Sequence, residues 1–283
     1  MDIDKAIKKL TEDIRKVSCS PRLDSEILIM KALNVSRSYL YTHKDKSINM
    51  KQKKLLDALL KRRMQNEPIA YITGKKEFWS REFYVSRDTL IPRPESELLI
   101  EELLKLTNKQ ETRKILELGT GCGALSISIA LELNNSLVTA LDISRKALKI
   151  ALKNAKKHQI ENVNFLESDW FKELNKKKFD FILSNPPYVK KNDPSLDALN
   201  FEPLKALVSG IDGLDSIRHI IANAKYHIKN GGTLLIEHGK DQKKDIFDIF
   251  NTNSWKNITC IEDLRGFPRL TMAKYATCSK SKK

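Results

Sequence analysis

The first 67 residues place apolar side chains three and four positions apart. The series from Ile3 to Ile14 shows this spacing, and it recurs further along the segment. Residues at these intervals share a helix face, so the pattern predicts amphipathic helices. Ser20 before Pro21 is typical of a helix start. We predict a bundle of about four short helices over residues 1–67, which either recognises the substrate or caps the fold.

Residues 68–94 follow a different pattern. The passage 68–74, Pro-Ile-Ala-Tyr-Ile-Thr-Gly, is rich in turn formers, and residues 77–79 and 82–85 are typical of short aromatic strands. We predict a linker that contains a β-hairpin. From Glu95 onward, acidic residues open a helix.

From residue 95 to the end, strand and helix patterns alternate. Short apolar runs predict strands near 114–118, 137–142, 163–166, 179–184, 233–237, 257–262 and 269–276. Apolar periodicity predicts helices near 124–133, 144–158, 213–229 and 240–250. Such repeats are typical of an α/β, Rossmann-like fold with a mainly parallel seven-stranded sheet, which binds ligands at the carboxyl ends of its strands. We assign residues 95–283 to this domain.

The composition adds little to this picture. A formal net charge of +15 favours acidic partners such as nucleic acid. The excess is mostly lysine scattered along helical faces, which indicates solvated charge, so nucleic acid is not required. A short disordered tail is expected at residues 280–283.

No apolar run approaches the ~20 residues that span a bilayer, and the amino terminus lacks a signal-peptide core. We therefore expect a cytoplasmic protein without a membrane partner, and a monomer. The four cysteines form no CxxC pair, which predicts reduced, mostly buried thiols. The five histidines show no ligand spacing, so no metal is expected.

A glycine-rich turn follows the first strand of the sheet. Residues 117–123 read Glu-Leu-Gly-Thr-Gly-Cys-Gly. Glycines there let the backbone turn sharply and approach a ligand. Asp142 ends the next strand, where its carboxylate can accept both ribose hydroxyls of a nucleoside. Gly119, Gly121 and Ala124 also satisfy the dinucleotide fingerprint, so an NAD-dependent dehydrogenase stays open at this step.

The tetrapeptide Asn185-Pro186-Pro187-Tyr188, hereafter the clamp, follows the strand at 179–184. Its consecutive prolines stiffen the backbone and leave carbonyls free to accept hydrogen bonds. Tyr188 offers an aromatic face that can pack against a flat acceptor.

These groups suit a planar NH2 acceptor, whose delocalised lone pair makes it a poor nucleophile. If its two N–H groups donate to the Asn185 side chain and the Pro186 carbonyl, electron density on the nitrogen rises and its position is fixed. Such positioning can lower a barrier by up to ~7–11 kcal/mol. A dehydrogenase has no evident use for this arrangement. The clamp therefore favours methylation of a planar nitrogen.

Trp170 lies in Ser168-Asp169-Trp170, after the third strand. Its indole can stack on adenine, with Asp169 near the edge of the base. A tryptophan at a strand end is equally often ordinary packing.

With these motifs in place, the sequence resembles the peptide chain release factor glutamine methyltransferases, the HemK/PrmC family, over nearly its whole length. The segment Ile-Pro-Arg-Pro-Glu-Ser-Glu at 91–97 is far more specific than the glycine loop. Besides it and the clamp, the resemblance rests on residues 68–74, Phe78-Trp79, Glu202-Pro203 through Ala206-Leu207, Asp212-Gly213-Leu214 and Gly266-Phe267-Pro268-Arg269.

The resemblance implies a class I methyltransferase fold that uses S-adenosylmethionine (AdoMet) and releases S-adenosylhomocysteine. The acceptor would be the side-chain amide nitrogen (N5) of the glutamine in the Gly-Gly-Gln motif of class I release factors, which modulates translation termination. The AdoMet site would comprise Glu117, Gly119, Thr120, Gly121, Cys122, Gly123, Asp142, Asp169, Trp170 and Asn185. The glutamine would be held by Asn185, Pro186, Pro187 and Tyr188, with Asn185, Pro186 and Tyr188 as the catalytic residues.

Three positions depart from the family pattern. Glu117 stands where aspartate is more usual, Ser80-Arg81 replaces a glycine, and His238 is unusual. The clamp alone does not distinguish a glutamine amide from a base amine, so an amino-methyltransferase acting on DNA or RNA stays the alternative. A binding module without activity is a third reading.

Overall fold

The computed structural model describes residues 1–253 and 255–276. The predicted tail at residues 280–283 and Cys278 lie outside them. The chain forms two compact units, Met1–Lys75 and Lys76–Lys283. The division at 1–67, 68–94 and 95–283 expected from sequence stays a prediction.

The first unit is helical, and its four predicted helices are confirmed. Its helices bury one hydrophobic cluster of their own, to which Ile3, Leu28 and Leu56 contribute. The passage expected to be turn-rich instead forms a short helix, which Gly74 ends in a left-handed conformation with φ 75°. The helices are α1 (Ile3–Asp13), α2 (Pro21–Leu33), α3 (Arg37–Thr42), α4 (Met50–Met64) and α5 (Ile69–Thr73).

The predicted hairpin is confirmed as β1 (Lys75–Phe78) and β2 (Arg81–Tyr84). Trp79 and Ser80 form its turn, with φ values of 50° and 55°. Two successive residues with positive φ are typical of the tight turn that matches strand twist. The turn therefore forms here without the glycine that the family more often has.

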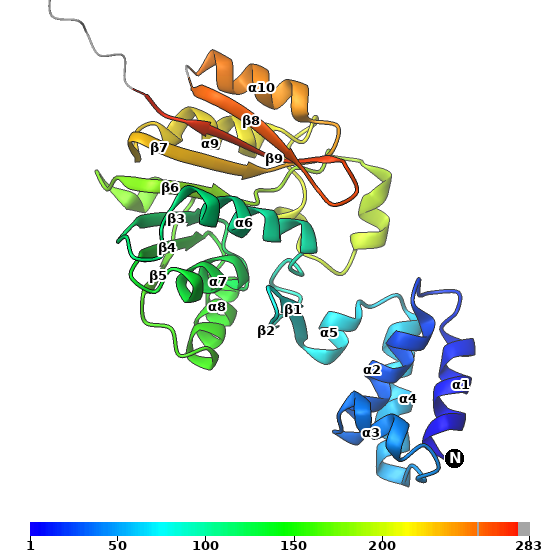
Figure 1. The fold of residues 1–283 in the computed structure, drawn as a ribbon. Coiled ribbons are helices and arrows are strands. Elements are labelled where there is room, and N and C mark those ends of the chain that lie inside the picture. Colours follow the sequence, from blue (N-terminus) through cyan, green and yellow to red (C-terminus); the bar gives the residue numbers. More distant parts are fainter. Residues whose placement is uncertain (254, 277–283) are drawn as a thin grey trace, which may run out of the picture. The chain divides into compact units, whose positions relative to one another are not determined.

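The second unit contains a seven-stranded sheet in the order β5-β4-β3-β6-β7-β9-β8 (Figure 1). Neighbouring strands from β5 to β7 pair in parallel, whereas β9 is antiparallel to both β7 and β8. This confirms the predicted α/β fold. The strands are β3 (Lys114–Leu118), β4 (Leu137–Asp142), β5 (Val163–Glu167), β6 (Phe179–Ser184), β7 (Ile228–Glu237), β8 (Lys256–Glu262) and β9 (Pro268–Lys274).

Helices α6, α7 and α8 pack in a row, and α9 packs against α10. Apolar side chains from β3, β6, β7, α9 and α10 form a continuous core. The remaining elements are η1 (Pro94–Ser96), α6 (Glu97–Leu106), α7 (Ala124–Glu132), α8 (Arg145–Lys157), η2 (Lys172–Leu174), η3 (Pro194–Leu199), η4 (Leu204–Ala206), α9 (Asp215–Ala224) and α10 (Lys243–Thr252).

The helix expected at 213–229 was predicted too long. It ends at Ala224, and β7 already begins at Ile228, which pairs with Phe179 of β6. The apolar spacing continues through Ile228, so the sequence pattern shows no break there. Strand pairing with β6 determines where the helix stops.

Candidate active site

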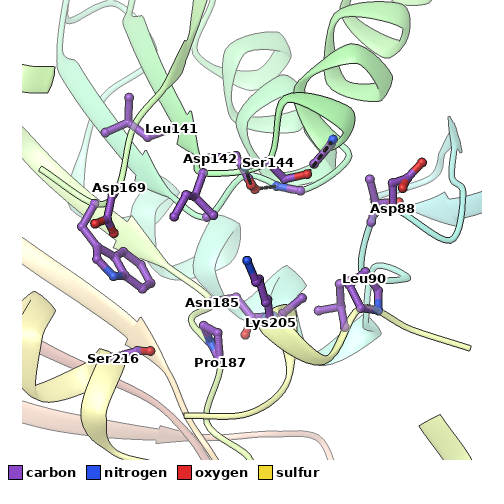
Figure 2. A pocket seen from close by; sticks show the side chains of 18 of the residues that line it. Asp88, Leu90, Leu141, Asp142, Ser144, Asp169, Asn185, Pro187, Lys205 and Ser216 are labelled. Atoms are coloured by element: carbon purple, nitrogen blue, oxygen red, sulfur yellow. Dashed lines mark hydrogen bonds between the residues drawn. The ribbon is translucent and has the colours of Figure 1, made fainter. Parts of the chain in front are cut away.

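A cavity of about 570 Å³ lies at the carboxyl ends of the parallel strands. Four successive strands supply its wall: Gly119 follows β3, Asp142 ends β4, Trp170 follows β5 and Asn185 follows β6. Figure 2 shows Asp142 and Ser144 on one side of this cavity, with Asn185 and Pro187 across from them. This is the position at which sheets of this topology bind ligands.

The glycine loop brings backbone close to this cavity. Gly119 and Gly121 line it and have φ values of 75° and 56°, a region that side-chain-bearing residues rarely adopt. The N–H of Gly119 donates to the Leu141 carbonyl over 2.9 Å, which joins the loop to β4. A Cβ at Gly123 would lie 3.0 Å from Cβ of Ala151, so a side chain there would press on α8.

The Asp142 carboxylate is fixed by two backbone groups. Its Oδ2 accepts from the N–H of Gly121 and its Oδ1 from the N–H of Ser144, each over 2.8 Å. Burial raises the pKa of Asp142, although these two bonds act in the opposite direction. Each oxygen retains a lone pair, so the carboxylate can still accept two ribose hydroxyls.

Trp170 and Asp169 both line the cavity. The backbone of Trp170 has φ 53°, which is uncommon for a bulky residue, and the Ser168 hydroxyl donates to its carbonyl over 2.7 Å. Such a conformation persists only where surrounding contacts hold it, and it directs the indole here. The geometry fits an adenine-stacking role, which stays a prediction.

Six of the predicted site residues do not line the cavity: Glu117, Thr120, Cys122, Gly123, Pro186 and Tyr188. The Glu117 carboxylate is buried and accepts from the Thr120 hydroxyl over 2.6 Å. Burial raises the pKa of Glu117 to about 7, despite the hydroxyls of Thr120 and Ser126. Burial likewise raises the pKa of the Cys122 thiol to about 12, so this sulfur is protonated at neutral pH.

Within the clamp, Asn185 and Pro187 line the cavity. Asn185 donates through Nδ2 to the Ser96 hydroxyl over 2.9 Å, and the Tyr188 hydroxyl donates to Glu237 over 3.2 Å. Burial raises the pKa of Tyr188, as does the neighbouring Glu237 charge. Both ends of the clamp are thus attached to the surrounding protein.

The segment 91–97 fixes the structure around the clamp. Arg93 forms an ion pair with the buried Glu202, which also accepts from the N–H of Ile91. Glu95 pairs with Arg265 over 2.8 Å, and Glu97 accepts from the N–H of Trp79 over 2.7 Å. Its charged residues therefore connect it to three separate segments, at Glu202, Arg265 and Trp79.

His238 does not line the cavity. It is fully buried, and its Nε2 lies 2.9 Å from the Thr271 hydroxyl of β9. Burial lowers the pKa of His238 to about 4, so the ring is neutral at pH 7.

Several lining residues were not predicted as site residues, although Pro203 to Ala206 lie in a segment that carries the family resemblance. They come from the end of the linker, from the ends of β4 and β5, from the start of α8, from the long connection between β6 and α9, and from α9 itself. They are Asp88, Thr89, Leu90, Leu141, Ile143, Ser144, Ala147, Ser168, Pro203, Leu204, Lys205, Ala206, Val208 and Ser216. Ser96 and Glu237, which contact the clamp, were also not predicted as site residues.

Two family models match this chain: "Methyltransferase small domain" over residues 94–201 and "PrmC N-terminal domain" over residues 5–74. Among solved structures, a methyltransferase from Pyrococcus furiosus superposes with a TM-score of 0.54 at 17% identity, over 77% of this chain and 98% of that one. The catalytic domain of hMettl16 superposes with a TM-score of 0.56 at 14% identity, over 68% and 73%. These structural likenesses show the fold.

Relatives along the whole chain are closer in sequence. The release factor glutamine methyltransferase of Coxiella burnetii is 43% identical, covering 97% of this chain and 99% of that protein. Those of Buchnera aphidicola and Vibrio cholerae are 41% and 40% identical, each over 97% of this chain.

The sheet, its closing antiparallel hairpin and the matched domain define a Rossmann-like, AdoMet-dependent methyltransferase. Within this class of methyltransferases, the relatives that match nearly the full length of the chain at about 40% identity identify the family. The chain belongs to the release factor glutamine methyltransferase family.

Proposed function

We propose that this protein transfers a methyl group from AdoMet to N5 of the glutamine in the Gly-Gly-Gln motif of class I peptide chain release factors. The observation that carries this proposal is the placement of Asn185 in the cavity wall, opposite Asp142. The names of the relatives that match the whole chain support a release factor glutamine as the methyl acceptor.

The residues around the cavity fit the cofactor. Asp142 would hold the ribose, Trp170 would stack on adenine with Asp169 beside it, and the backbone at Gly119 and Gly121 would face the rest of the molecule. We keep Glu117, Thr120, Cys122 and Gly123 in the proposed site as the residues that shape this loop. Bound AdoMet supplies an electrophilic methyl group on a sulfonium, so the protein need only position the acceptor.

The clamp would perform that positioning. Within residues 1–253 and 255–276, neither Asn185 Oδ1 nor the Pro186 carbonyl accepts a hydrogen bond. These two oxygens can therefore accept the two N–H groups of a glutamine amide, which increases the electron density on its nitrogen. Pro187 and Tyr188 would pack against the plane of the amide. The nitrogen then needs no prior deprotonation, since its proton can leave after the methyl group is transferred.

Labelled AdoMet and intact release factor test this function. The purified protein should label wild-type release factor and fail to label a variant with Gln→Ala in the Gly-Gly-Gln motif. Equal labelling of both would reject the proposal. Labelling of DNA or ribosomal RNA in place of release factor would identify the acceptor as a base amine, which presents the same two N–H groups.

We further propose a division of labour along the chain. Residues 1–67 would recognise the release factor away from its glutamine, residues 68–94 would link, and residues 95–283 would carry out transfer. In this proposal the protein acts in the cytoplasm, where a soluble translation factor is found, and it acts as a monomer. Among the described residues, no helix has the length and apolar character needed to cross a membrane.

A further inference from the structure

A chain of hydrogen bonds connects the two ends of the clamp behind the cavity wall. Asn185 Nδ2 donates to Ser96 Oγ over 2.9 Å, and Ser96 Oγ donates to Glu237 Oε2 over 2.6 Å. The Tyr188 hydroxyl donates to the other carboxylate oxygen, Oε1, over 3.2 Å. Ser96 and Glu237 are 6% and 1% exposed, so water does not compete for these contacts.

The chemistry of these groups sets the direction of each bond. An ionised carboxylate has no hydrogen to donate, so Ser96 must give its hydroxyl hydrogen to Glu237. The Ser96 oxygen is then left only as an acceptor toward Asn185. It therefore faces the NH2 end of the Asn185 amide, and Oδ1 is held at the opposite end of that group.

We propose that Ser96 and Glu237 are positioning residues, which orient the Asn185 amide so that Oδ1 accepts from the glutamine nitrogen. This inference rests on the proposed function. Without the pair, the Asn185 amide could turn over and present its NH2 group to the acceptor, where two donors would face each other. Glu237 also fixes Tyr188 through the same carboxylate, so one buried charge positions the side chains of Asn185 and Tyr188.

The position of Glu237 in the fold supports this role. It is the last residue of β7, and its neighbour Ile236 pairs with Ser184, the residue directly before Asn185. Ser96 ends η1 within the segment 91–97, whose other polar residues anchor it independently. Both groups are therefore held rigidly beside the clamp by separate elements.

The arrangement depends on the charge of Glu237. Burial raises the pKa of Glu237 to about 7, while the Ser96 hydroxyl and the Arg269 charge of β9 act in the opposite direction. Tyr188, which stays neutral, and the nearby carboxylate Glu95 are the other ionisable groups that act on it. Once protonated, Glu237 can itself donate to Ser96, and the Ser96 hydrogen can then point toward Asn185. The amide orientation is no longer imposed, so transfer should weaken as the pH falls through about 7.

The alternative is that the hydrogen bond between Ser96 and Glu237 only attaches η1 to β7 and has no effect on the clamp. A merely structural tie would change stability, and with it every ligand's affinity, but it would not link the rate of transfer to one ionisation. The pH profile of kcat and the separation of kcat from binding distinguish the two roles.

The test compares wild type with Ser96→Ala, Ser96→Thr and Glu237→Gln, using intact release factor and saturating AdoMet between pH 5.5 and 8.5. Ser96→Ala should lower kcat by about tenfold to a hundredfold, as expected when a reacting group is misplaced. Its AdoMet affinity should stay within about twofold of wild type, and Ser96→Thr, which keeps the hydroxyl, should restore most of kcat. Wild-type kcat should rise with pH through about 7, whereas that of Glu237→Gln should be low and flat.

Ser128→Ala is the matched control, because Ser128 is a fully buried serine of α7 whose hydroxyl has no hydrogen-bond partner among the described residues. If wild type methylates the release factor glutamine and Ser96→Ala matches it at every pH, the inference is wrong and the proposed function stands. A pH-dependent kcat in Glu237→Gln like that of wild type would also overturn it. If wild type fails to label the glutamine at all, the proposed function fails, and the inference fails with it.

Discussion

The carboxylate of Asp142 accepts a hydrogen bond from the backbone N–H of Gly121 over 2.8 Å. This contact fixes the tip of the glycine loop to the end of β4, so Asp142, the proposed ribose-binding residue, also holds the loop. In the proposed function the same carboxylate would therefore serve both the loop and the cofactor.

Replacing Asp142 with alanine should lower AdoMet affinity by about tenfold to a hundredfold, because charge-assisted hydrogen bonds contribute about 1.5–3 kcal/mol. Isothermal titration calorimetry measures this. Glu167→Ala is the control, since Glu167 pairs with Asp142 in strand register but lies outside the cavity lining. Affinities of the two variants that differ by less than about twofold would exclude a specific role for Asp142.

Trp170 gives a prediction about aromatic stacking. Trp170→Ala should weaken AdoMet binding about tenfold, because an adenine ring would lose its stacking surface. Trp170→Phe should keep most of the affinity, since a smaller ring still stacks. Fluorescence or calorimetric titration of both variants decides this. An alanine variant that binds as tightly as wild type would show that the indole only packs against the core.

Much of the fold was predictable because several strands are short, continuous apolar runs bounded by turn residues. β3, β4 and β6 have the bounds expected from sequence. The end of α9 was not predictable, because the pairing of Ile228 with Phe179 is a tertiary event that no local pattern records.

The site also has a part that the sequence predicts and a part that it does not. The glycine loop and the clamp are local sequences, and the topology of a parallel sheet brings the ends of β3 and β6 together. Ser96 and Glu237 are 141 positions apart in sequence, and serine and glutamate are common residues at any position. Only the folded arrangement shows that their side chains meet next to Asn185.

Glu117 should make stability depend on pH. Its pKa is raised from 4.5 to about 7 by burial, so the folded chain binds this proton more tightly than the unfolded chain. Its contribution to stability is therefore complete below about pH 4.5 and is lost as the pH rises to about 7. Relative to wild type, Glu117→Gln should become more stable between pH 5 and 8, by on the order of 3 kcal/mol. Urea denaturation across this range measures the difference, and parallel curves would contradict the prediction.

Glu132 should stabilise the hairpin turn. It accepts from Trp79 Nε1 over 3.0 Å and from Arg81 over 2.9 Å, and it also pairs with Lys109. Burial alone would raise the pKa of Glu132, but these three partners outweigh it and hold the value at about 2. Glu132→Ala should cost about 1–3 kcal/mol at pH 7.

The pH dependence of stability provides a control for the stabilising role of Glu132. A lowered pKa means that the charged form stabilises the fold above about pH 4.5 and that this contribution is lost as the pH falls toward 2. The difference in unfolding free energy between wild type and Glu132→Gln should therefore narrow over that interval. A difference that stays constant would mean that the charge of Glu132 does not contribute.

Removal of the amino-terminal unit tests substrate recognition. The helical unit buries its own hydrophobic cluster, and a chain that begins at Lys75 keeps β1, the whole sheet and the buried side chains of Phe78, Phe83 and Leu99. Its AdoMet affinity should stay within about twofold of the full chain, whereas KM for intact release factor should rise at least about tenfold, because contacts remote from the glutamine are lost. A cooperative thermal transition checks that the shortened chain folds. If AdoMet affinity falls as far as release factor binding does, the amino-terminal helices are a structural cap for the second unit and the recognition proposal is wrong.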